Sequence, residues 1–139
     1  MEIKTCNKSS IQKIVDGINN YNLQQVAALA PTWTPLEFHM ENEEKEIIGG
    51  VLGGIGYWNG LEIKILWVEE NYRKEGIGSK LLKHIENIAK EKGATISMLD
   101  TFNFQAKDFY LKNGYQIFGE IDNFPEGHQR VYLSKKLNS

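Results

Sequence analysis

The sequence predicts an α/β or α+β fold in which helices flank a mixed β-sheet. The first half of the chain contains alternating strand patterns joined by turn residues, and the second half alternates strands with helical patterns. The chain has 139 residues and lacks an internal repeat, a low-complexity tract or a Pro/Gly/Ser-rich linker. We therefore expect one domain over residues 1–139, long enough to enclose a hydrophobic core.

The bulk composition is that of a globular protein. Hydrophobic residues make up 41% of the chain and charged residues 24%, and no apolar run approaches the roughly 20 residues of a membrane-spanning helix. The formal net charge is -2, so no general basic field attracts nucleic acid. Cys6 is the single cysteine, which excludes an intrachain disulfide and a cysteine zinc cluster. We expect a cytoplasmic protein that holds no metal and binds neither nucleic acid nor a membrane.

The N-terminal third begins with a short helical pattern. Ser9 or Ser10 would cap this helix, its apolar residues recur at helical spacing, and Asn19-Asn20 would end it. Residues 22–35 contain the run Pro-Thr-Trp-Thr-Pro, which predicts an extended connection.

Two strands joined by a hairpin follow. Apolar and polar residues alternate over residues 36–41, the charged segment 41–46 predicts a turn, and residues 47–58 return as a second strand with five glycines. No helical pattern follows these glycines, so a bulged, closely packed strand is favoured over a phosphate-binding loop. Asn59-Gly60 then predicts a further hairpin.

The strand predicted over residues 61–68 changes character along its length. Simple alternation places four apolar residues on one face: Leu61, Ile63, Ile65 and Trp67. The other face changes from charged residues to Leu66 and Val68. An apolar end of this kind predicts a central strand that is covered on both faces.

The second half of the chain alternates helices with strands. Apolar residues at helical spacing predict a helix from Ile77 that ends before Gly93, followed by a strand over residues 95–101. A second helix is predicted over residues 104–113, and strands over residues 115–121 and 129–137. This order is the reason for expecting a mixed sheet.

The segment most suggestive of chemistry is the pattern Arg-x-x-Gly-x-Gly at residues 73–78, between an apolar strand and an amphipathic helix. A helix N-terminus presents unpaired backbone N–H groups and the positive end of the helix dipole. Gly76 and Gly78 let the backbone approach a bulky anion, and Arg73 and Lys74 add positive charge, so the segment predicts a pyrophosphate site. The Gly-Lys-Ser/Thr sequence of a Walker loop is absent.

Residues 73–78 resemble the coenzyme A pyrophosphate motif of the GNAT superfamily of N-acyltransferases. The segment 103–115 is similar to a second signature of that superfamily, in which Asn103, Ala106 and Tyr110 sit on one helix and Gly and an aromatic residue follow. On a helix this spacing would place the three residues on one face. The resemblance covers residues 61–137 well and the first 35 residues poorly.

The resemblance implies acetyl-CoA as co-substrate and a mostly antiparallel central sheet splayed between two strands. Backbone N–H groups of residues 73–79 would hold the pyrophosphate, and the main chain of residues 66–68 would pair with the pantetheine arm and offer an N–H to the reaction oxyanion. Asn103 would also bond the arm. The implied cofactor-binding residues are Leu66, Trp67, Val68, Arg73, Lys74, Glu75, Gly76, Ile77, Gly78, Ser79, Asn103, Ala106 and Tyr110.

The resemblance also implies that an amine attacks the thioester directly and that Tyr110 protonates the departing thiolate. For the base that removes a proton from the amine, Glu62 is the first candidate, because it lies on the strand upstream of the oxyanion position. Glu69 and Glu70 are alternatives that flank the turn, and His128 is a candidate for the wall of the acceptor pocket.

The predicted function is therefore N-acetyl transfer from acetyl-CoA to a primary amine on a small molecule or a peptide. Tyr57 and Trp58 are candidates for the acceptor wall, although core packing explains them equally. The alternatives are an acyl-CoA-binding sensor without turnover and, less favoured, a nucleotide-binding protein with the same phosphate site. The resemblance also makes a homodimer possible.

Overall fold

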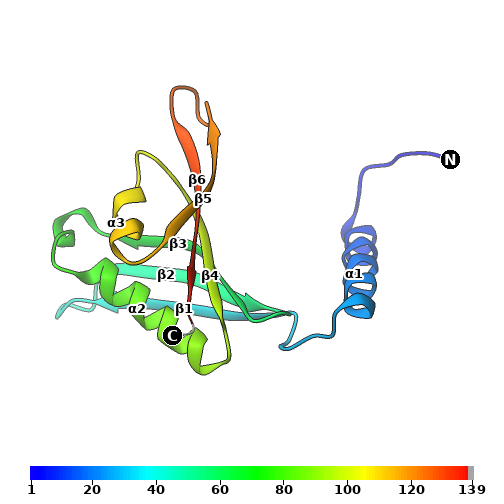
Figure 1. Ribbon diagram of the computed structural model, residues 1–139, viewed down its shortest axis with the longest axis horizontal. Helices are drawn as coiled ribbons and strands as arrows, with labels where there is room; N and C mark the ends of the chain where they lie inside the picture. The colour runs from blue at the N-terminus through cyan, green and yellow to red at the C-terminus, as the bar shows by residue number, and fades with distance from the viewer. Residues whose placement is uncertain (138–139) are drawn as a thin grey trace.

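The computed structural model describes residues 1–137, in which six strands form one sheet in the order β1-β2-β3-β4-β6-β5 (Figure 1). The strands are β1 Trp33–Glu41, β2 Ile47–Gly56, β3 Gly60–Val68, β4 Ile96–Phe102, β5 Gln116–Asp122 and β6 Gln129–Lys136. The β3–β4 pair is parallel and the other neighbouring pairs are antiparallel, which confirms the predicted mixed sheet. The last two residues of the predicted domain, Asn138 and Ser139, lie outside the described residues.

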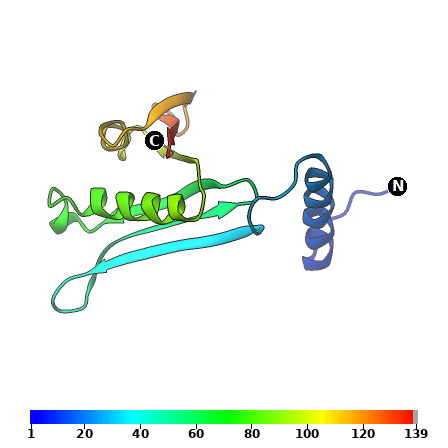
Figure 2. The ribbon, with the colours of Figure 1, turned by 60° about the horizontal axis from the view of Figure 1, so that its bottom comes forward.

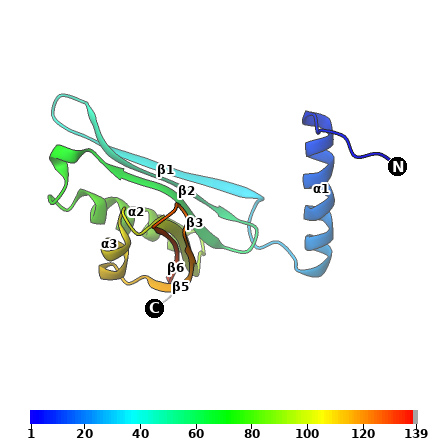
Figure 3. The same cartoon turned by 90° about the horizontal axis from the view of Figure 1, so that it is seen from above.

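Two of the three α-helices pack on one face of this sheet. The helices are α1 Lys8–Gln25, α2 Ile77–Glu91 and α3 Lys107–Lys112, with a 3₁₀ turn η1 over Glu70–Tyr72. Helix α2 lies along β1, β2 and β3, and α3 lies beside it near β5, whereas α1 stands beyond the end of the sheet where β1 begins (Figures 2 and 3). None of the helices within residues 1–137 is long and apolar enough to cross a membrane.

Helix α1 is longer than the sequence predicted. Its N-cap is Asn7, whose side chain accepts a hydrogen bond from the Ser10 N–H at 2.9 Å, while Ser10 Oγ accepts one from the Asn7 N–H at 2.8 Å. The helix passes through Asn19-Asn20, because asparagine weakens a helix by well under about 1 kcal/mol and neither Gly nor Pro follows it. It ends before Val26, where the backbone becomes extended.

The β2–β3 ladder contains a bulge, and its extra residue lies in β3, opposite the glycine-rich strand β2. The β2–β3 register shifts between Leu52 and Gly53, so that Lys64 of β3 has no partner in the ladder. A Cβ atom at Gly53 would lie 2.4 Å from the carbonyl oxygen of Glu62, which only glycine tolerates. Close packing between the two strands, rather than phosphate binding, accounts for this glycine. The hairpin to β3 also forms, with a turn from Gly56 to Asn59.

The bulge reverses the alternation of β3, and the prediction that its apolar end is covered on both faces was wrong. Leu61 and Ile63 are buried under α2, whereas Ile65 and Trp67 are 54% and 46% exposed on the opposite face. A one-residue slip sends each later side chain to the other face of a strand. Within residues 1–137 no helix packs on that face, so these side chains stay uncovered.

The core under α2 and α3 contains a polar network that the sequence did not reveal. Glu86 of α2 is 5% exposed, and its carboxylate accepts hydrogen bonds from the Tyr115 hydroxyl at 2.7 Å and from Lys135 Nζ at 2.9 Å. The Tyr115 hydroxyl also lies 2.8 Å from Ser97 Oγ. The buried carboxylate is therefore both paired and hydrogen-bonded, as burial requires. In the sequence, Glu86 reads as an ordinary surface residue of an amphipathic helix.

Candidate active site

The sheet opens at the carboxyl end of β3. The parallel ladder between β3 and β4 contains only the pairs of Gly60, Leu61 and Glu62 with residues 96–98, after which the strands separate. On the side toward β4, no strand of the described chain therefore pairs with the main chain of residues 66–68. An extended ligand can add to such an edge by main-chain hydrogen bonds. The predicted splay between two strands is confirmed.

A groove of about 620 Å³ occupies this opening and continues to the N-terminus of α2. One wall comes from β3, the floor from the turn before α2, and the other wall from the segment that leads into α3. The lining residues are Leu66, Trp67, Val68, Tyr72, Arg73, Lys74, Gly76, Ile77, Gly78, Ser79, Phe104, Gln105, Ala106, Phe109 and Tyr110.

The floor of the groove presents free backbone donors. No atom of residues 1–137 accepts a hydrogen bond from the N–H groups of residues 74–79, because these residues form the turn and first turn of α2. Gly76 caps the helix with a φ of 79°, a conformation that favours glycine. At Gly78 a Cβ atom would lie 3.3 Å from the Phe109 ring, so glycine keeps the floor open. Arg73 Nε donates to the Val68 carbonyl at 3.1 Å and ties the turn to β3.

The groove brings together eleven of the thirteen predicted cofactor-binding residues; Glu75 and Asn103 are not in its lining. Sequence reasoning missed four lining residues, which are Tyr72, Phe104, Gln105 and Phe109. Tyr72 lies in η1, Phe104 and Gln105 in the turn before α3, and Phe109 in α3, so only the tertiary packing of these segments brings the four side chains to the groove.

Asn103 and Ala106 do not lie on the helix that the sequence predicted. The segment before α3 is a turn, Ala106 is the N-cap, and the helix begins at Lys107. The Asn103 side-chain oxygen accepts a hydrogen bond from the Gln129 N–H at 3.0 Å, which ties the turn to β6. Local side chain–backbone bonds of this kind compete with helix formation. The common helical face of Asn103, Ala106 and Tyr110 was therefore a wrong expectation, and cofactor contact by Asn103 stays a prediction.

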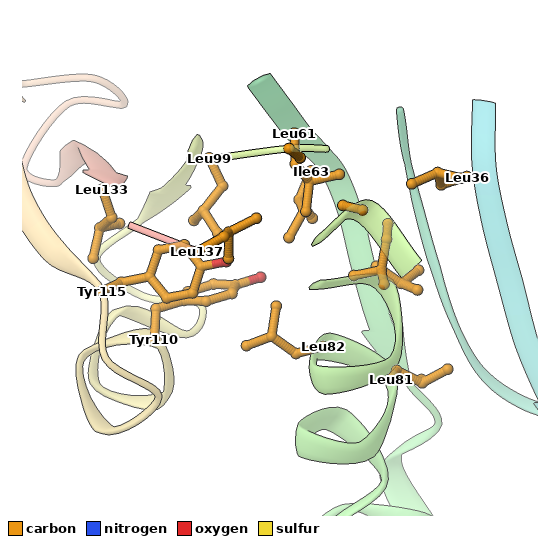
Figure 4. Packing of buried hydrophobic residues seen from close by; sticks show 14 of the residues in the cluster. Leu36, Leu61, Ile63, Leu81, Leu82, Leu99, Tyr110, Tyr115, Leu133 and Leu137 are labelled. Carbon is orange, nitrogen blue, oxygen red and sulfur yellow. The ribbon is translucent and has the colours of Figure 1, made fainter. Parts of the chain in front are cut away.

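Tyr110 is the one predicted catalytic residue on the groove wall. Burial raises the pKa of its phenol to about 12, so the hydroxyl keeps its proton at neutral pH. The hydroxyl has no hydrogen-bond partner within residues 1–137. The neighbouring Tyr115 differs, because its hydroxyl is engaged by Glu86 and Ser97, and burial raises its pKa well above the usual range. Figure 4 shows both rings in the core between Leu133 and Leu82.

Glu62 lies outside the groove lining, at the last ladder pair before β3 and β4 separate. Its side chain is exposed on the face opposite α2.

His128 packs edge-on against Phe104, with 5.0 Å between the two ring centroids, which places it beside the groove wall. Tyr57 and Trp58 lie in the β2–β3 turn, at the other end of β3 from residues 66–68, and a place for them in the acceptor wall stays a prediction. Glu69 accepts from the Asn71 N–H at 2.9 Å and caps η1.

The groove, the splayed strands and the anion floor match a known family. The model of the acetyltransferase (GNAT) family matches residues 16–115. The chain belongs to the acetyltransferase (GNAT) family. Blasticidin-S acetyltransferase from Streptomyces morookaense is 35% identical over 107 residues, which cover 74% of this chain and 78% of that protein.

Solved structures of acetyltransferases share the fold. A crystal structure of an acetyltransferase from Bacillus cereus ATCC 14579 is 35% identical and superposes with a TM-score of 0.90 over 98% of this chain and 97% of its own. A Bacillus anthracis str. Ames structure, described as that of a streptothricin acetyltransferase in complex with acetyl coenzyme A, is 24% identical. It superposes with a TM-score of 0.66 over 79% of this chain and 65% of its own.

Family membership makes the chain an acyl-CoA-dependent acetyltransferase with acetyl-CoA as co-substrate, as predicted. The residues present fit this co-substrate in two respects. The N–H groups of residues 74–79 and the side chains of Arg73 and Lys74 suit a pyrophosphate. The unpaired main chain of residues 66–68 suits an amide-containing arm that binds as an added strand.

We expect Gly78→Asp to weaken acetyl-CoA binding by about 100-fold or more, because a carboxylate in the floor occupies the anion site and repels phosphate. Isothermal titration with acetyl-CoA measures this loss directly. Asn87→Asp is the matched control, since it adds the same charge on an exposed position of α2 outside the groove. Equal affinities for the two variants would contradict a phosphate site at residues 74–79.

Proposed function

We propose that this acetyltransferase moves the acetyl group of acetyl-CoA to a primary amine, with Tyr110 as the general acid, within a single domain. The observation that supports this assignment most strongly is the state of the Tyr110 hydroxyl. Burial raises the pKa of this phenol to about 12, its hydroxyl has no hydrogen-bond partner within residues 1–137, and Tyr110 is among the residues that line the groove whose floor suits a pyrophosphate. Tyr115, beside it, lacks this freedom because its hydroxyl is already bonded.

In the proposed reaction the amine nitrogen attacks the thioester carbonyl, a C–N bond forms and the C–S bond breaks. The backbone of residues 66–68 supplies an N–H for the negative oxygen that develops on the carbonyl. Tyr110 gives its proton to the departing sulfur. Glu62, directly or through water, accepts the proton that the amine loses. Holding thioester and amine together contributes much of the rate, so no covalent enzyme intermediate is needed.

The proposed acceptor is an amine on a small molecule, and antibiotic-like amines are the first to test. The 35% identity to a blasticidin-S acetyltransferase supports this choice. Polyamines, amino-acid derivatives and peptide amines are the other classes to compare. The carboxylate of Glu62, where β3 leaves β4, and that of Glu70, just after β3, are both exposed and favour a cationic acceptor.

The test combines a binding measurement with a turnover measurement. Titration of the protein with acetyl-CoA, with ATP as a control nucleotide, is expected to give micromolar-range binding of acetyl-CoA alone. Release of CoA is then followed with a thiol reagent in the presence of blasticidin S, spermidine, an amino-acid amide and a lysine peptide. Binding without CoA release for any amine would favour the acyl-CoA sensor over the enzyme, and equal competition by ATP would favour a nucleotide site.

We expect Glu62→Gln to lower kcat/KM by about 100-fold, because the amide cannot accept a proton. Glu37→Gln is the control, since Glu37 is an exposed glutamate of strand β1 outside the groove lining and the same charge is lost. A kcat/KM of Glu62→Gln equal to that of the wild type would mean that another group, or water, is the base.

A further inference from the structure

Helix α1 carries an apolar stripe that packs against no other element within residues 1–137. The helix buries none of its residues. Four side chains at helical spacing form the stripe and are 41% to 61% exposed: Ile11, Ile14, Val15 and Ile18. In all three views the helix stands apart from the sheet (Figures 1–3). An amphipathic helix in water ordinarily covers its apolar side, because packing supplies most of its stability.

The sheet carries a second uncovered apolar surface, on the face opposite α2. We call it the free-face patch and define it as Leu52, Ile65, Trp67 and Met98, which are 40% to 54% exposed. Leu52 and Ile65 are direct partners in the β2–β3 ladder, so their side chains share one face. The bulge in β3 places Trp67 there as well. Exposed apolar side chains that gather on one face of a sheet mark a candidate interaction surface.

The connection between α1 and the sheet directs the helix away from its own free-face patch. The N–H groups of Leu29 and Ala30 both donate to the Tyr57 carbonyl, at 2.8 and 3.0 Å. Trp58 Nε1 donates to the Val26 carbonyl at 3.4 Å. These contacts hold residues 26–30 against the β2–β3 turn. Folding α1 back onto the sheet of the same chain would require a reorganisation of this connection.

The related Bacillus cereus crystal structure supports the same position. Its superposition covers 98% of this chain with a TM-score of 0.90. Residues 1–25 are too large a part of the chain to be displaced in a superposition of that quality. The detached α1 is therefore a shared feature of two chains that are 35% identical.

We propose that two copies of this chain form a homodimer by exchanging α1, so that the stripe of each helix packs on the free-face patch of the other copy. Each chain carries both the stripe and the free-face patch. A two-fold exchange buries both surfaces of both copies and gives a closed dimer, to which no third copy adds.

The exchange has a consequence for the active site, which rests on the proposed function. Trp67 belongs to both the groove lining and the free-face patch. Glu62, at the point where β3 and β4 separate, lies on the same face. A helix from the partner copy over this patch would close the groove on the side where the amine must enter. The acceptor pocket is then complete only in the dimer and contains residues of both copies.

The first test uses one change on each face of α1. Light scattering of the wild-type chain is expected to give a mass about twice 15.9 kDa. Ile14→Glu places a charge in the stripe and is expected to give a monomer that still binds acetyl-CoA but transfers acetyl at least about tenfold more slowly. Asn20→Glu adds the same charge on the opposite, exposed side of α1 and is expected to remain a dimer with wild-type activity.

A wild-type monomer, or an Ile14→Glu dimer, would overturn the exchange. These mass measurements do not depend on turnover. Failure of the proposed function, seen as absent transfer by the wild-type dimer, is therefore distinct from failure of the exchange.

The second test separates exchange between copies from packing within one chain. In a Cys6→Ser background, Ile14→Cys and Ile65→Cys are combined in the full chain and oxidised. Exchange predicts a disulfide-linked dimer on a non-reducing gel. A fast-migrating monomer would show that α1 folds back on its own sheet, and no cross-link would exclude contact between stripe and patch; both would refute the proposal. The combination of Asn20→Cys with Ile65→Cys is the control that should not cross-link.

Discussion

Tyr110→Phe is expected to lower kcat for acetyl transfer by about 100-fold or more, the usual contribution of a positioned general acid. The affinity for acetyl-CoA is expected to change by no more than about twofold, because the ring and its packing remain and only an unpaired hydroxyl is lost. Steady-state assays of CoA release, with calorimetric titration of the same protein, measure the two quantities separately.

Tyr115→Phe is the matched control, since the same atom is removed from an adjacent ring in the same core. It breaks the contacts to Glu86 and Ser97, so it is expected to lower the free energy of unfolding by about 1–3 kcal/mol and to leave kcat near that of the wild type. Equal rates for Tyr110→Phe and wild type would remove Tyr110 from the mechanism.

The pH dependence of the wild type adds an independent check on Tyr110. Because burial raises the pKa of its phenol to about 12, loss of the acid through ionisation is expected only above pH 10. The raised pKa also makes the free energy of unfolding depend on pH. The neutral phenol favours the folded state below the ordinary pKa near 10, and this contribution is lost as the pH rises toward about 12. A fall in kcat between pH 7 and pH 9 that Tyr110→Phe abolishes would contradict the raised pKa.

Gly53→Ala is expected to lower the free energy of unfolding by about 1–3 kcal/mol, the usual cost of overpacking. The added Cβ atom would lie 2.4 Å from the Glu62 carbonyl oxygen, which is main chain and cannot swing away as a side chain does. The β2–β3 bulge must open or shift to admit it. Thermal unfolding followed by circular dichroism measures the change, with an expected drop in Tm of several degrees, at about 2–4 °C for each kcal/mol.

Gly56→Ala provides the comparison on the same strand. Its Cβ atom would meet nothing closer than the Thr32 carbonyl at 3.9 Å, which is an ordinary contact, so its Tm should stay close to that of the wild type. Activity of Gly53→Ala is informative as well, because the bulge sets the direction of residues 66–68 along the groove. Equal Tm values for the two variants would mean that the bulge relaxes without cost.

Elements that depend on local patterns could be predicted from the amino-acid sequence. Alternation, helical spacing and turn residues predicted β1–β6, α2 and the parallel-plus-antiparallel sheet close to their observed positions. The same holds for the floor of the groove. Residues 73–79 are contiguous, and a strand followed by a glycine turn and a helix builds an anion site whatever surrounds it. This is why most of the predicted cofactor residues lie together in the groove.

Features that depend on contacts between residues distant in the sequence became visible only in the folded chain. The bulge arises where Gly53 meets Glu62, and it moved Ile65 and Trp67 to the free face. The turn at Asn103 is held by Gln129, and the burial of Glu86 depends on residues that include Lys135. The placement of α1 depends on its connection to the β2–β3 turn. Such long-range contacts produce no repeating pattern in the sequence. The conformation that a residue's neighbours in sequence favour can change when a distant segment packs against it, because the contact changes which conformation has the lowest free energy.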